Sequence, residues 1–403
     1  MTTLERFLRY VEIDSSSDKT VKEKPTSKGQ IELLRLLEKE LKEIGLNAKY
    51  FDAGYVTAKI PANVKGKKKV AFLAHVDTVK VENNGKVNAR KVVFDGQSIK
   101  YDNGLEINLT TNPELKGREG EEFIVSDGKT ILGKDDKAGI AEIMTMAEYF
   151  VNNPEVPHGD VMIAFTSDEE ISRGVEGFDV ENFGADVGYT LDGGTIGEVE
   201  YHNFHGGNAI INIEGVPAHT GYAKNIMINA INVLGDFMAN FPESERPSTT
   251  EGFEGFYHFY KVEGSMSTAL AEIMIRDFFD DKYQEKKNFV LDCVAKINAK
   301  YGKEVVKCKF EDKTRNMYEV VKEHMYIVEI AKKAYEKHGI KPIENPVRGG
   351  TDGARLSFMG LPCPNLATGG NNAHSNIEYL SVKELNLMVD VIIDIVKLYA
   401  EMN

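Results

Sequence analysis

The chain has 403 residues, of which 42% are hydrophobic, and a formal net charge of −14 at pH 7. That length is too great for one ordinary core, so two globular domains are expected. The excess of carboxylates argues against a surface for nucleic acid or for an anionic membrane. Cys293, Cys308 and Cys363 are widely spaced without a CxxC pair, which argues against a disulfide framework or a structural zinc finger and favours a reducing cytoplasm.

The N-terminal region predicts two amphipathic helices. Apolar residues at helical spacing in 4–11 alternate with charges, which is typical of a helix and not of a signal peptide. No stretch of the chain approaches the length of a membrane span. Ser27 is a candidate N-cap for a second helix, which stops at Gly45. Its apolar stripe consists of Ile31, Leu34, Leu37, Leu41 and Ile44.

Strands are predicted next along the chain. Residues 55–60 alternate, and the continuous apolar run 70–74 is typical of a strand that is covered on both faces. This run is followed by His75, and Asp77 lies on the same face, so that its carboxylate can orient the histidine ring. Residues 80–125 predict loops and hairpins with little visible chemistry.

Three consecutive acids follow a buried-strand pattern in the middle of the chain. The apolar run 161–165 leads through Thr-Ser to Asp168, Glu169 and Glu170. Three carboxylates at the end of a buried strand repel one another and lose hydration unless a cation neutralises them. Taken alone, the three acids fit an exposed acidic turn after an edge strand better than a metal site. Asp168 is assigned no role beyond that turn.

Other predicted strands also end in side chains that bind metals. The run 187–191 ends in Asp192, and a Gly/Asn turn near the C-terminus delivers His374. In open α/β sheets, sites form in the crevice at the carboxyl ends of the strands. We therefore expect His75 and Asp192 to meet the acids that follow the run 161–165.

Two further motifs lie at predicted helix N-termini. Asp135 and Asp136 stand where the helix dipole favours negative charge, and capping alone explains one of the two. Arg348 precedes a Gly pair, after which Thr351 or Asp352 can cap a helix whose free N–H groups bind an anion. An ordinary capped loop is the simpler interpretation of this second motif.

The middle of the chain predicts a β-α-β-β-α-β order, which is the ferredoxin-like unit. The predicted strands are 210–215, 256–263, 269–278 and 304–310, and the predicted helices are 225–239 and 283–300. We place an inserted domain at about 206–316. The surrounding α/β domain then comprises 1–205 and 317–403, and it resumes in a helix over 320–337 and closes with a helix over 382–400.

Two histidines and three carboxylates can give two metal ions three protein ligands each if one carboxylate bridges. They are His75, Asp135, Glu170, Asp192 and His374. Nitrogen and oxygen ligands without thiolates suit zinc, cobalt or manganese in an open, catalytic site. Each of these residues taken singly is more often structural, so the interpretation rests on their number.

Eight short motifs occur in order along the chain. They are His75-Val-Asp-Thr, Gly133-Lys-Asp-Asp-Lys-Ala-Gly, Asp168-Glu-Glu, Asp192-Gly-Gly, Pro217-Ala-His-Thr-Gly, Arg276-Asp-Phe, Arg348-Gly-Gly-Thr-Asp-Gly and Gly369-Gly-Asn-Asn-Ala-His. Together they resemble the two-zinc exopeptidase family, which holds tripeptide aminopeptidases, dipeptidases, carboxypeptidases and aminoacylases. The resemblance runs almost end to end and is weakest over 80–125. It implies an α/β fold, in which a mixed-sheet catalytic domain carries an inserted ferredoxin-like lid domain.

The resemblance implies how the two zinc ions are held. The implied ligands are Asp135 as the bridge, His75 and Asp192 on one ion, and Glu170 and His374 on the other. Asp136 remains the alternative bridging ligand. Asp135 is preferred because the ligand in this family stands two residues before a lysine, here Lys137.

The resemblance also implies roles around the metals. Glu169 is the implied general base and Asp77 the orienting aspartate. On the inserted domain, His219 resembles the lid histidine that stabilises the oxyanion. Arg276 resembles a residue that grips the peptide carboxylate, with Arg348 as its assistant. Some relatives supply the lid histidine from a partner subunit, so a homodimer is compatible with the family.

The implied reaction is hydrolysis by a zinc-bridging water, whose proton Glu169 takes and returns to the leaving amine. We therefore expect a cytoplasmic zinc aminopeptidase that releases the N-terminal residue of a small peptide, a tripeptide. A dipeptidase or an N-acyl amino acid deacylase is the alternative, because the metal constellation is common to all and selectivity sits in the lid. A metal-stabilised binding protein without catalysis ranks below both. Such a protein would be expected to keep the ligands and lose the base, whereas this chain has Glu169.

Overall fold

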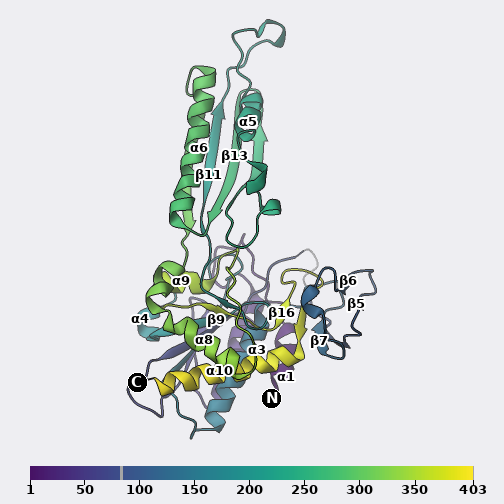
Figure 1. Cartoon of the computed structure of the whole chain (residues 1–403), viewed down its shortest axis with the longest axis vertical. Helices are drawn as coiled ribbons and strands as arrows, with labels where there is room; N and C mark the ends of the chain where they lie inside the picture. Colours follow the sequence, from purple (N-terminus) through teal and green to yellow (C-terminus); the bar gives the residue numbers. More distant parts are fainter. Residues whose placement is uncertain (82–84, 403) are drawn as a thin grey trace. The chain divides into compact units, whose positions relative to one another are not determined.

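The structure is a computed structural model that describes residues 1–81 and 85–402 (Figure 1). The chain forms two compact units. Unit 1 comprises Met1–Tyr201, Met317–Asn345 and Thr351–Asn403, and unit 2 comprises His202–Asn316 and Pro346–Gly350. Residues 346–350, which the sequence places in the second part of the catalytic domain, therefore pack within unit 2. In the described part of the chain, no helix is both long and apolar enough to cross a membrane.

A mixed sheet of seven strands forms the centre of unit 1. Its order is β1 (Lys49–Phe51), β2 (Tyr55–Ile60), β8 (Val161–Thr166), β3 (Val70–His75), β9 (Val187–Leu191), β15 (Asn365–Leu366) and β10 (Val199–Glu200). Strands β8, β3, β9 and β15 run parallel, whereas β1, β2 and β10 make the antiparallel pairings at the two edges. The sequence predicted the strands over 55–60, 70–74, 161–166 and 187–191 at these positions.

The continuous apolar run of β3 reflects burial on both faces of the sheet. Val70, Phe72 and Ala74 join the large core that the long helices cover. Ala71 and Leu73 point to the other face, where they pack in a smaller core. A strand that is covered on both sides gains nothing from alternation, which is why its sequence is apolar throughout.

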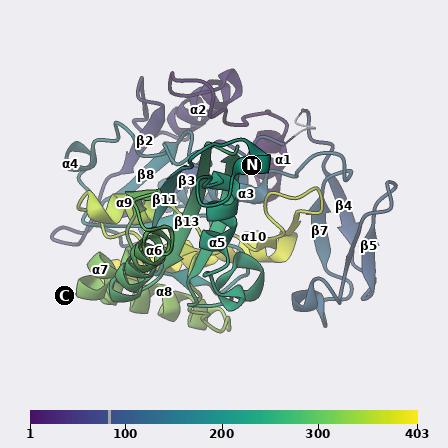
Figure 2. The ribbon, with the colours of Figure 1, turned by 90° about the horizontal axis from the view of Figure 1, so that it is seen from above.

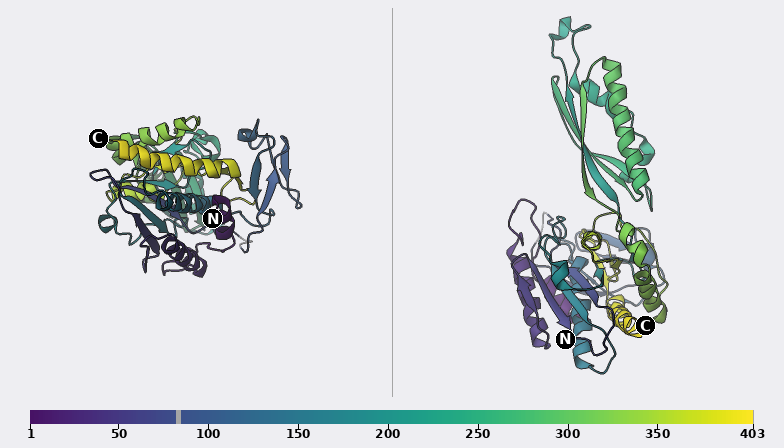
Figure 3. Two further views of the ribbon diagram at one scale, coloured as in Figure 1. Left: turned by 90° about the horizontal axis from the view of Figure 1, so that it is seen from below. Right: turned by 90° about the vertical axis from the view of Figure 1, so that its left-hand side faces the viewer.

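The helices of unit 1 pack around this sheet. They are α1 (Thr3–Val11), α2 (Lys28–Glu43), α3 (Lys134–Asn152), α4 (Val180–Phe183), α7 (Tyr318–Val321), α8 (Tyr326–Lys337), α9 (Asp352–Phe358) and α10 (Val382–Glu401). Helix α10 lies beside both α3 and α8, and the pair α8 and α10 is seen from below in Figure 3. The single helix predicted over 320–337 is wrong, because a 3-10 turn at Lys322–His324 separates α7 from α8.

The prediction for α2 needs two corrections. Ser27 occupies the N-cap position, but its side chain makes no capping hydrogen bond. Ile31 is 38% exposed, whereas Leu33 is fully buried and takes its place in the apolar stripe. The helix is therefore turned slightly from the predicted face, and packing rather than a hydroxyl cap secures its first turn.

A second, smaller sheet in unit 1 joins two distant parts of the sequence. Its order is β16 (Gly370–Asn371), β17 (Tyr379–Ser381), β7 (Glu122–Val125) and β4 (Arg90–Val93). The hairpin of β5 (Ser98–Lys100) and β6 (Glu106–Asn108) and the 3-10 turn Pro113–Leu115 belong to the same region, which lies to the side of the main sheet in Figure 2. The loops and hairpins predicted for 80–125 are thus present, apart from 82–84, which lie outside the described residues. Their pairing with β17 was not predicted.

Unit 2 is a four-stranded antiparallel sheet with two helices. Its elements in chain order are β11 (His205–Glu214), α5 (Ala230–Met238), β12 (Phe256–Gly264), β13 (Thr268–Asp277), α6 (Asp280–Tyr301) and β14 (Val306–Thr314), and the strand order is β12-β13-β11-β14. This is the β-α-β-β-α-β unit that the sequence predicted. Helix α5 begins later than predicted because Asn229 caps it, accepting a hydrogen bond of 2.9 Å from the backbone N–H of Ile231.

Candidate metal centre

The carboxyl ends of three neighbouring strands converge at one edge of the main sheet. His75 is the last residue of β3, and Asp192 directly follows β9, the parallel neighbour of β3. Glu169 and Glu170 follow β8, which pairs with β3 on the other side. The structure therefore brings these side chains to one crevice, as strand polarity predicts.

The start of α3 separates the two adjacent aspartates. The peptide bond between Asp135 and Asp136 is cis, and neither residue has helical dihedral angles. The carboxylate of Asp136 faces inward, where it accepts hydrogen bonds from the backbone N–H groups of His75 (3.1 Å) and Gly139 (3.3 Å). Asp136 is thus occupied in capping the helix and fastening it to β3, and Asp135 alone turns its carboxylate to the other candidate ligands.

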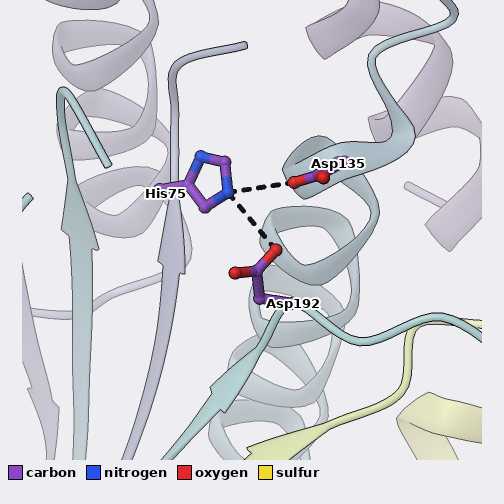
Figure 4. A group of neighbouring side chains, drawn as sticks. All are labelled: His75, Asp135 and Asp192. Carbon is purple, nitrogen blue, oxygen red and sulfur yellow. Dashed lines mark hydrogen bonds and ion pairs between the residues drawn. The ribbon is translucent and has the colours of Figure 1, made fainter. Parts of the chain in front are cut away.

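Five side chains form two groups of three that share Asp135. In the first group, Nε2 of His75 lies 3.0 Å from Oδ1 of Asp135 and 3.3 Å from Oδ1 of Asp192 (Figure 4). In the second, Nε2 of His374 lies 3.1 Å from Oδ2 of Asp135 and 2.9 Å from Oε1 of Glu170. Within each group the candidate ligand atoms lie within 4.8 Å of one another. The two oxygens of one carboxylate therefore face two different histidines.

This donor set fits divalent cations. Donor atoms that are separated by about 3 Å can surround a point about 2 Å from each, which is the usual zinc–nitrogen and zinc–oxygen distance. Oε1 of Glu170 is buried and accepts no hydrogen bond from the described residues, although Nε2 of His374 lies 2.9 Å away. The two atoms are thus close without the geometry of a hydrogen bond, which suits a cation shared between them.

The charges of the group shift several pKa values. Burial disfavours the protonated ring of His75, but the carboxylates of Asp192 and Asp135 outweigh it and raise its pKa well above the usual value. The carboxylates of Asp135 and Glu170, whose oxygens lie 3.1 and 2.9 Å from Nε2, raise the pKa of His374 to about 10. Burial, followed by repulsion from Asp135, raises the pKa of Asp192 to about 7. The clustered carboxylates thus stabilise positive charge at this site. A divalent cation can neutralise them in place of the protons.

Asp77 holds the turn that carries the two glutamates. Its Oδ1 accepts a hydrogen bond of 2.9 Å from the N–H of Glu169, and its Oδ2 accepts one of 3.1 Å from the N–H of Glu170. Nδ1 of His75 lies closer to the backbone carbonyl oxygen of Asp77 (3.0 Å) than to its carboxylate (3.5 Å). The ring was expected to be oriented by the carboxylate of Asp77, but the hydrogen-bond contact comes from the backbone carbonyl oxygen. The carboxylate instead accepts hydrogen bonds from the N–H groups of Glu169 and Glu170.

The partly buried side chain of Glu169 has a strongly perturbed carboxyl group. Burial raises its pKa well above the usual value, and the neighbouring carboxylates of Asp352 and Asp192 add to this effect. Asp352 is itself buried at the start of α9, where its carboxylate accepts a hydrogen bond of 3.0 Å from the hydroxyl of Thr166. Thr351 is the N-cap of α9, accepting a hydrogen bond of 3.3 Å from the N–H of Gly353.

Three of the predicted site residues lie in unit 2. Nδ1 of the exposed His219 accepts a hydrogen bond of 3.2 Å from the N–H of Gly221. Nη1 of Arg276, on β13, donates to the carbonyl oxygens of Ile275 (2.8 Å) and Gly207 (3.0 Å). Burial lowers the pKa of this guanidinium, which nevertheless remains charged.

Arg348 is engaged by another loop of unit 2. Its Nη1 donates to the carbonyl oxygens of Gly252 (2.7 Å) and Glu254 (3.0 Å), and its Nη2 donates to the hydroxyl of Thr250 (3.0 Å). The guanidinium also lies over the ring of Phe204, 5.2 Å from its centre. Both terminal nitrogens of the guanidinium thus bind the loop 250–254. The sequence did not predict this contact.

Sequence reasoning missed residues that support the centre from behind. Glu378 is buried, and its carboxylate accepts hydrogen bonds from the N–H groups of Gly133 (2.6 Å) and Asp135 (3.4 Å). Lys134 is also buried, and its ammonium donates to the carbonyl oxygen of Gly193 (3.3 Å) among the carboxylates. The only signal for Glu378 is its position four residues after His374, which by itself indicates nothing.

Asp168, which the sequence assigned to the turn alone, also links that turn to another part of the chain. It is buried with a left-handed φ of 64°. Its carboxylate accepts hydrogen bonds from the N–H and hydroxyl of Thr26 and, at 2.8 Å, from the side-chain amide of Gln30. The acidic turn is therefore fastened to the start of α2, a contact between residues far apart in the sequence.

The chain belongs to peptidase family M20/M25/M40, whose family model matches residues 122–398. It is 46% identical over 400 residues to peptidase T of Clostridium perfringens, and the match covers 98% of both chains. The fold is similar to that of the aminopeptidase PepT from Bacillus cereus (TM-score 0.79, 22% identity, 99% of this chain and 98% of that one). A tripeptidase from Staphylococcus aureus gives a TM-score of 0.78 at 21% identity with the same coverage. The resemblance and the α/β fold class predicted from the motifs are confirmed, and the protein is a peptidase.

Proposed function

We propose that the protein is a metal-dependent aminopeptidase that removes the N-terminal residue of tripeptides. The position of Asp135 carries the proposal, because its two oxygens face His75 at 3.0 Å and His374 at 3.1 Å. A carboxylate shared by two groups of three donors is what a pair of catalytic ions requires. The names of the relatives, peptidase T, aminopeptidase and tripeptidase, support the substrate class.

Two ions per subunit are proposed, zinc in the first place with cobalt or manganese as substitutes. Their ligands are His75 and Asp192 for one, Glu170 and His374 for the other, and Asp135 for both. When bound, such ions supply Lewis-acid chemistry, since they lower the pKa of water and polarise a carbonyl group. The absence of thiolates from the donor set favours a catalytic site over a closed structural one.

Glu169 is proposed as the general base. Its backbone is fixed by the hydrogen bond to Asp77, and its neighbour Glu170 belongs to the donor set. The raised pKa of Glu169 suits a group that takes a proton from the attacking water and returns it to the leaving amine. Adjacent side chains thus divide the work, Glu170 as a ligand and Glu169 as the proton carrier.

Unit 2 is proposed to act as the lid that recognises the substrate. Because Nδ1 of His219 accepts a hydrogen bond, the neutral ring carries its proton on Nε2, which can then donate to the oxyanion of the transition state. The charged fork of Arg276 suits the carboxylate of the peptide. Arg348 contributes indirectly by holding the loop 250–254. A homodimer in which the partner supplies the lid histidine fits the same chemistry.

A substrate comparison tests the proposal. A tripeptide, its matching dipeptide and the same tripeptide with an acetylated N-terminus are assayed with and without a chelator. We expect rapid cleavage of the free tripeptide alone and its loss on chelation. Equal cleavage of the acetylated tripeptide would indicate a deacylase or another exopeptidase, faster cleavage of the dipeptide would indicate a dipeptidase, and activity that survives chelation would remove the metal from the mechanism.

A further inference from the structure

Asn112 brings the small-sheet region into contact with the metal centre. It is only 3% exposed and immediately precedes the 3-10 turn Pro113–Leu115. Its side-chain amide forms a reciprocal pair with that of Asn372, in which Nδ2 of Asn112 donates to Oδ1 of Asn372 at 3.1 Å and Nδ2 of Asn372 donates to Oδ1 of Asn112 at 3.4 Å. Asn372 stands two residues before His374, so the pair holds the loop that carries this candidate ligand.

The loop needs such support because its backbone is unfavourable. Asn372 and His374 both have a left-handed backbone, with φ of 60° and 66°. Asparagine and histidine adopt this region more often than most residues, but it remains uncommon for any residue with a Cβ atom, so contacts outside the loop help to fix the conformation. Within the loop, Asn372 donates to the carbonyl oxygen of Ile377 at 3.2 Å, and the hydroxyl of Ser375 donates to the carbonyl oxygen of Asn372 at 2.7 Å.

Asn112 is itself held rigidly. Its Nδ2 also donates to Oε1 of Glu114 at 2.8 Å, and the same oxygen accepts a hydrogen bond of 2.5 Å from the hydroxyl of Tyr379. Tyr379 is the first residue of β17, at the far end of the His374 loop. Side chains from the small-sheet region therefore hold the loop on both sides of His374.

The ring of His374 lacks the local support that His75 has. Nδ1 of His75 lies 3.0 Å from the carbonyl oxygen of Asp77, which sets the direction of Nε2. Among the residues that the structure describes, Nδ1 of His374 has no hydrogen-bond partner, and the side chain is 49% exposed. The direction of its Nε2 therefore depends on the backbone of the loop.

We propose that Asn112 is a positioning residue for the second metal ion, acting through Asn372 on His374. The inference rests on the proposed function, in which His374 and Glu170 hold that ion. It assigns a part in catalysis to a region in which the sequence shows no chemistry. Asn112 touches neither substrate nor ion, so its loss weakens one ion selectively and leaves the ion between His75 and Asp192 in place.

Cobalt(II) titration followed by absorption spectroscopy and equilibrium dialysis tests this selectivity. Asn112→Ala is compared with the unaltered protein and with Asn103→Ala, a matched control whose amide donates to Gly128 (2.9 Å) and not to the His374 loop. We expect Asn112→Ala to bind one cobalt ion normally and the other about 10- to 100-fold more weakly. The control should bind both ions like the unaltered protein.

Asn372→Gly tests the same pair from the other side, because glycine keeps the left-handed backbone without strain. It should weaken the same ion, and adding Asn112→Ala should cause no further loss. It also decides the question if Asn112→Ala proves unfolded by circular dichroism. The inference would be overturned, and the proposed function left standing, if Asn112→Ala weakened the binding of both cobalt ions equally. The same holds if Asn112→Ala and Asn372→Gly both bound the two ions with unchanged affinity. An unaltered protein that binds no cobalt would overturn the proposed function instead.

Discussion

The two halves of the candidate metal centre are built in different ways. His75 and Asp192 stand at the ends of neighbouring parallel strands, and the side chain of His75 is 3% exposed. Glu170 and His374 stand on loops, and the side chain of His374 is 49% exposed. The first half is thus fixed by the ladder of the main sheet, whereas the second depends on side chains that reach it from elsewhere. We call them the strand half and the loop half.

The difference teaches where support for a ligand must be sought. In the strand half, backbone hydrogen bonds of the sheet set the positions, and the side-chain oxygen of Asn365 accepts a hydrogen bond of 3.0 Å from the N–H of Asp192. In the loop half, Asp77 holds the N–H of Glu170, and Asn112 holds the loop of His374 through Asn372. The loop half should therefore be the more sensitive to substitutions outside the donor set.

The largest effect is expected at Glu169 and Glu170, of which only Glu170 belongs to the loop half. Glu169→Ala should lower kcat by about two to four orders of magnitude while two ions stay bound, because it removes the base and no ligand. Glu170→Ala should lose one ion as well. Kinetics together with metal analysis by equilibrium dialysis separate the two, and Glu176→Ala, a substitution at an exposed glutamate of the same segment, serves as the control. Identical metal loss in both variants would contradict the division of roles.

A smaller effect is expected when the support of the acidic turn is weakened. Asp77→Asn keeps one oxygen acceptor and loses the other, so one of the N–H groups of Glu169 and Glu170 is left without its partner. We expect a loss of about 10- to 100-fold in kcat/KM or in affinity for the ion of the loop half. If the ion between His75 and Asp192 were weakened more, orientation of the His75 ring would be the chief role of Asp77.

Metal affinity should rise with pH in both halves. The neighbouring carboxylates raise the pKa of His75 and raise that of His374 to about 10, so both rings favour the protonated form in the metal-free protein and each ion competes with a proton. Affinity should increase about tenfold per pH unit for each proton released. Below about pH 7, Asp192 adds a further proton in the strand half, so its dependence should be steeper there. Calorimetric titration in buffers of different ionisation enthalpy counts these protons, and an affinity that is constant between about pH 6 and pH 8 would refute this account.

The smallest effect concerns the stability of the metal-free fold. His75→Ala should lower the free energy of unfolding by about 2 kcal/mol, because it leaves buried carboxylates without their hydrogen-bonded partner. His374→Ala should cost less than about 1 kcal/mol, because the side chain of His374 is half exposed and solvent screens its ion pairs. Urea unfolding in the presence of a chelator measures both. Equal costs would mean that the two halves do not differ in rigidity.

Much of the fold followed from local patterns. The strands at 70–74, 161–166 and 187–191 were predicted because burial on two faces leaves continuous apolar runs. The strand at 55–60 followed from its alternation, and the fold of unit 2 followed from the β-α-β-β-α-β order of its predicted elements. Element boundaries failed where packing decides them. The break between α7 and α8 has no strong local signal. The late start of α5 at Ala230 does have one, the N-cap residue Asn229, which the sequence prediction overlooked.

The sequence by itself determined the kinds of ligand at this centre and the strand ends that bring His75 and Asp192 together, because the polarity of parallel strands fixes which ends meet. The spacing to Lys137 favoured Asp135 over Asp136 as the candidate bridge, but only the tertiary structure shows that the carboxylate of Asp136 is turned to the backbone N–H of His75. The supporting contacts of Asp168, Glu378 and Asn112 are also visible only in the tertiary structure. Each makes side-chain contacts with residues that are distant in the sequence, and no local pattern records such contacts.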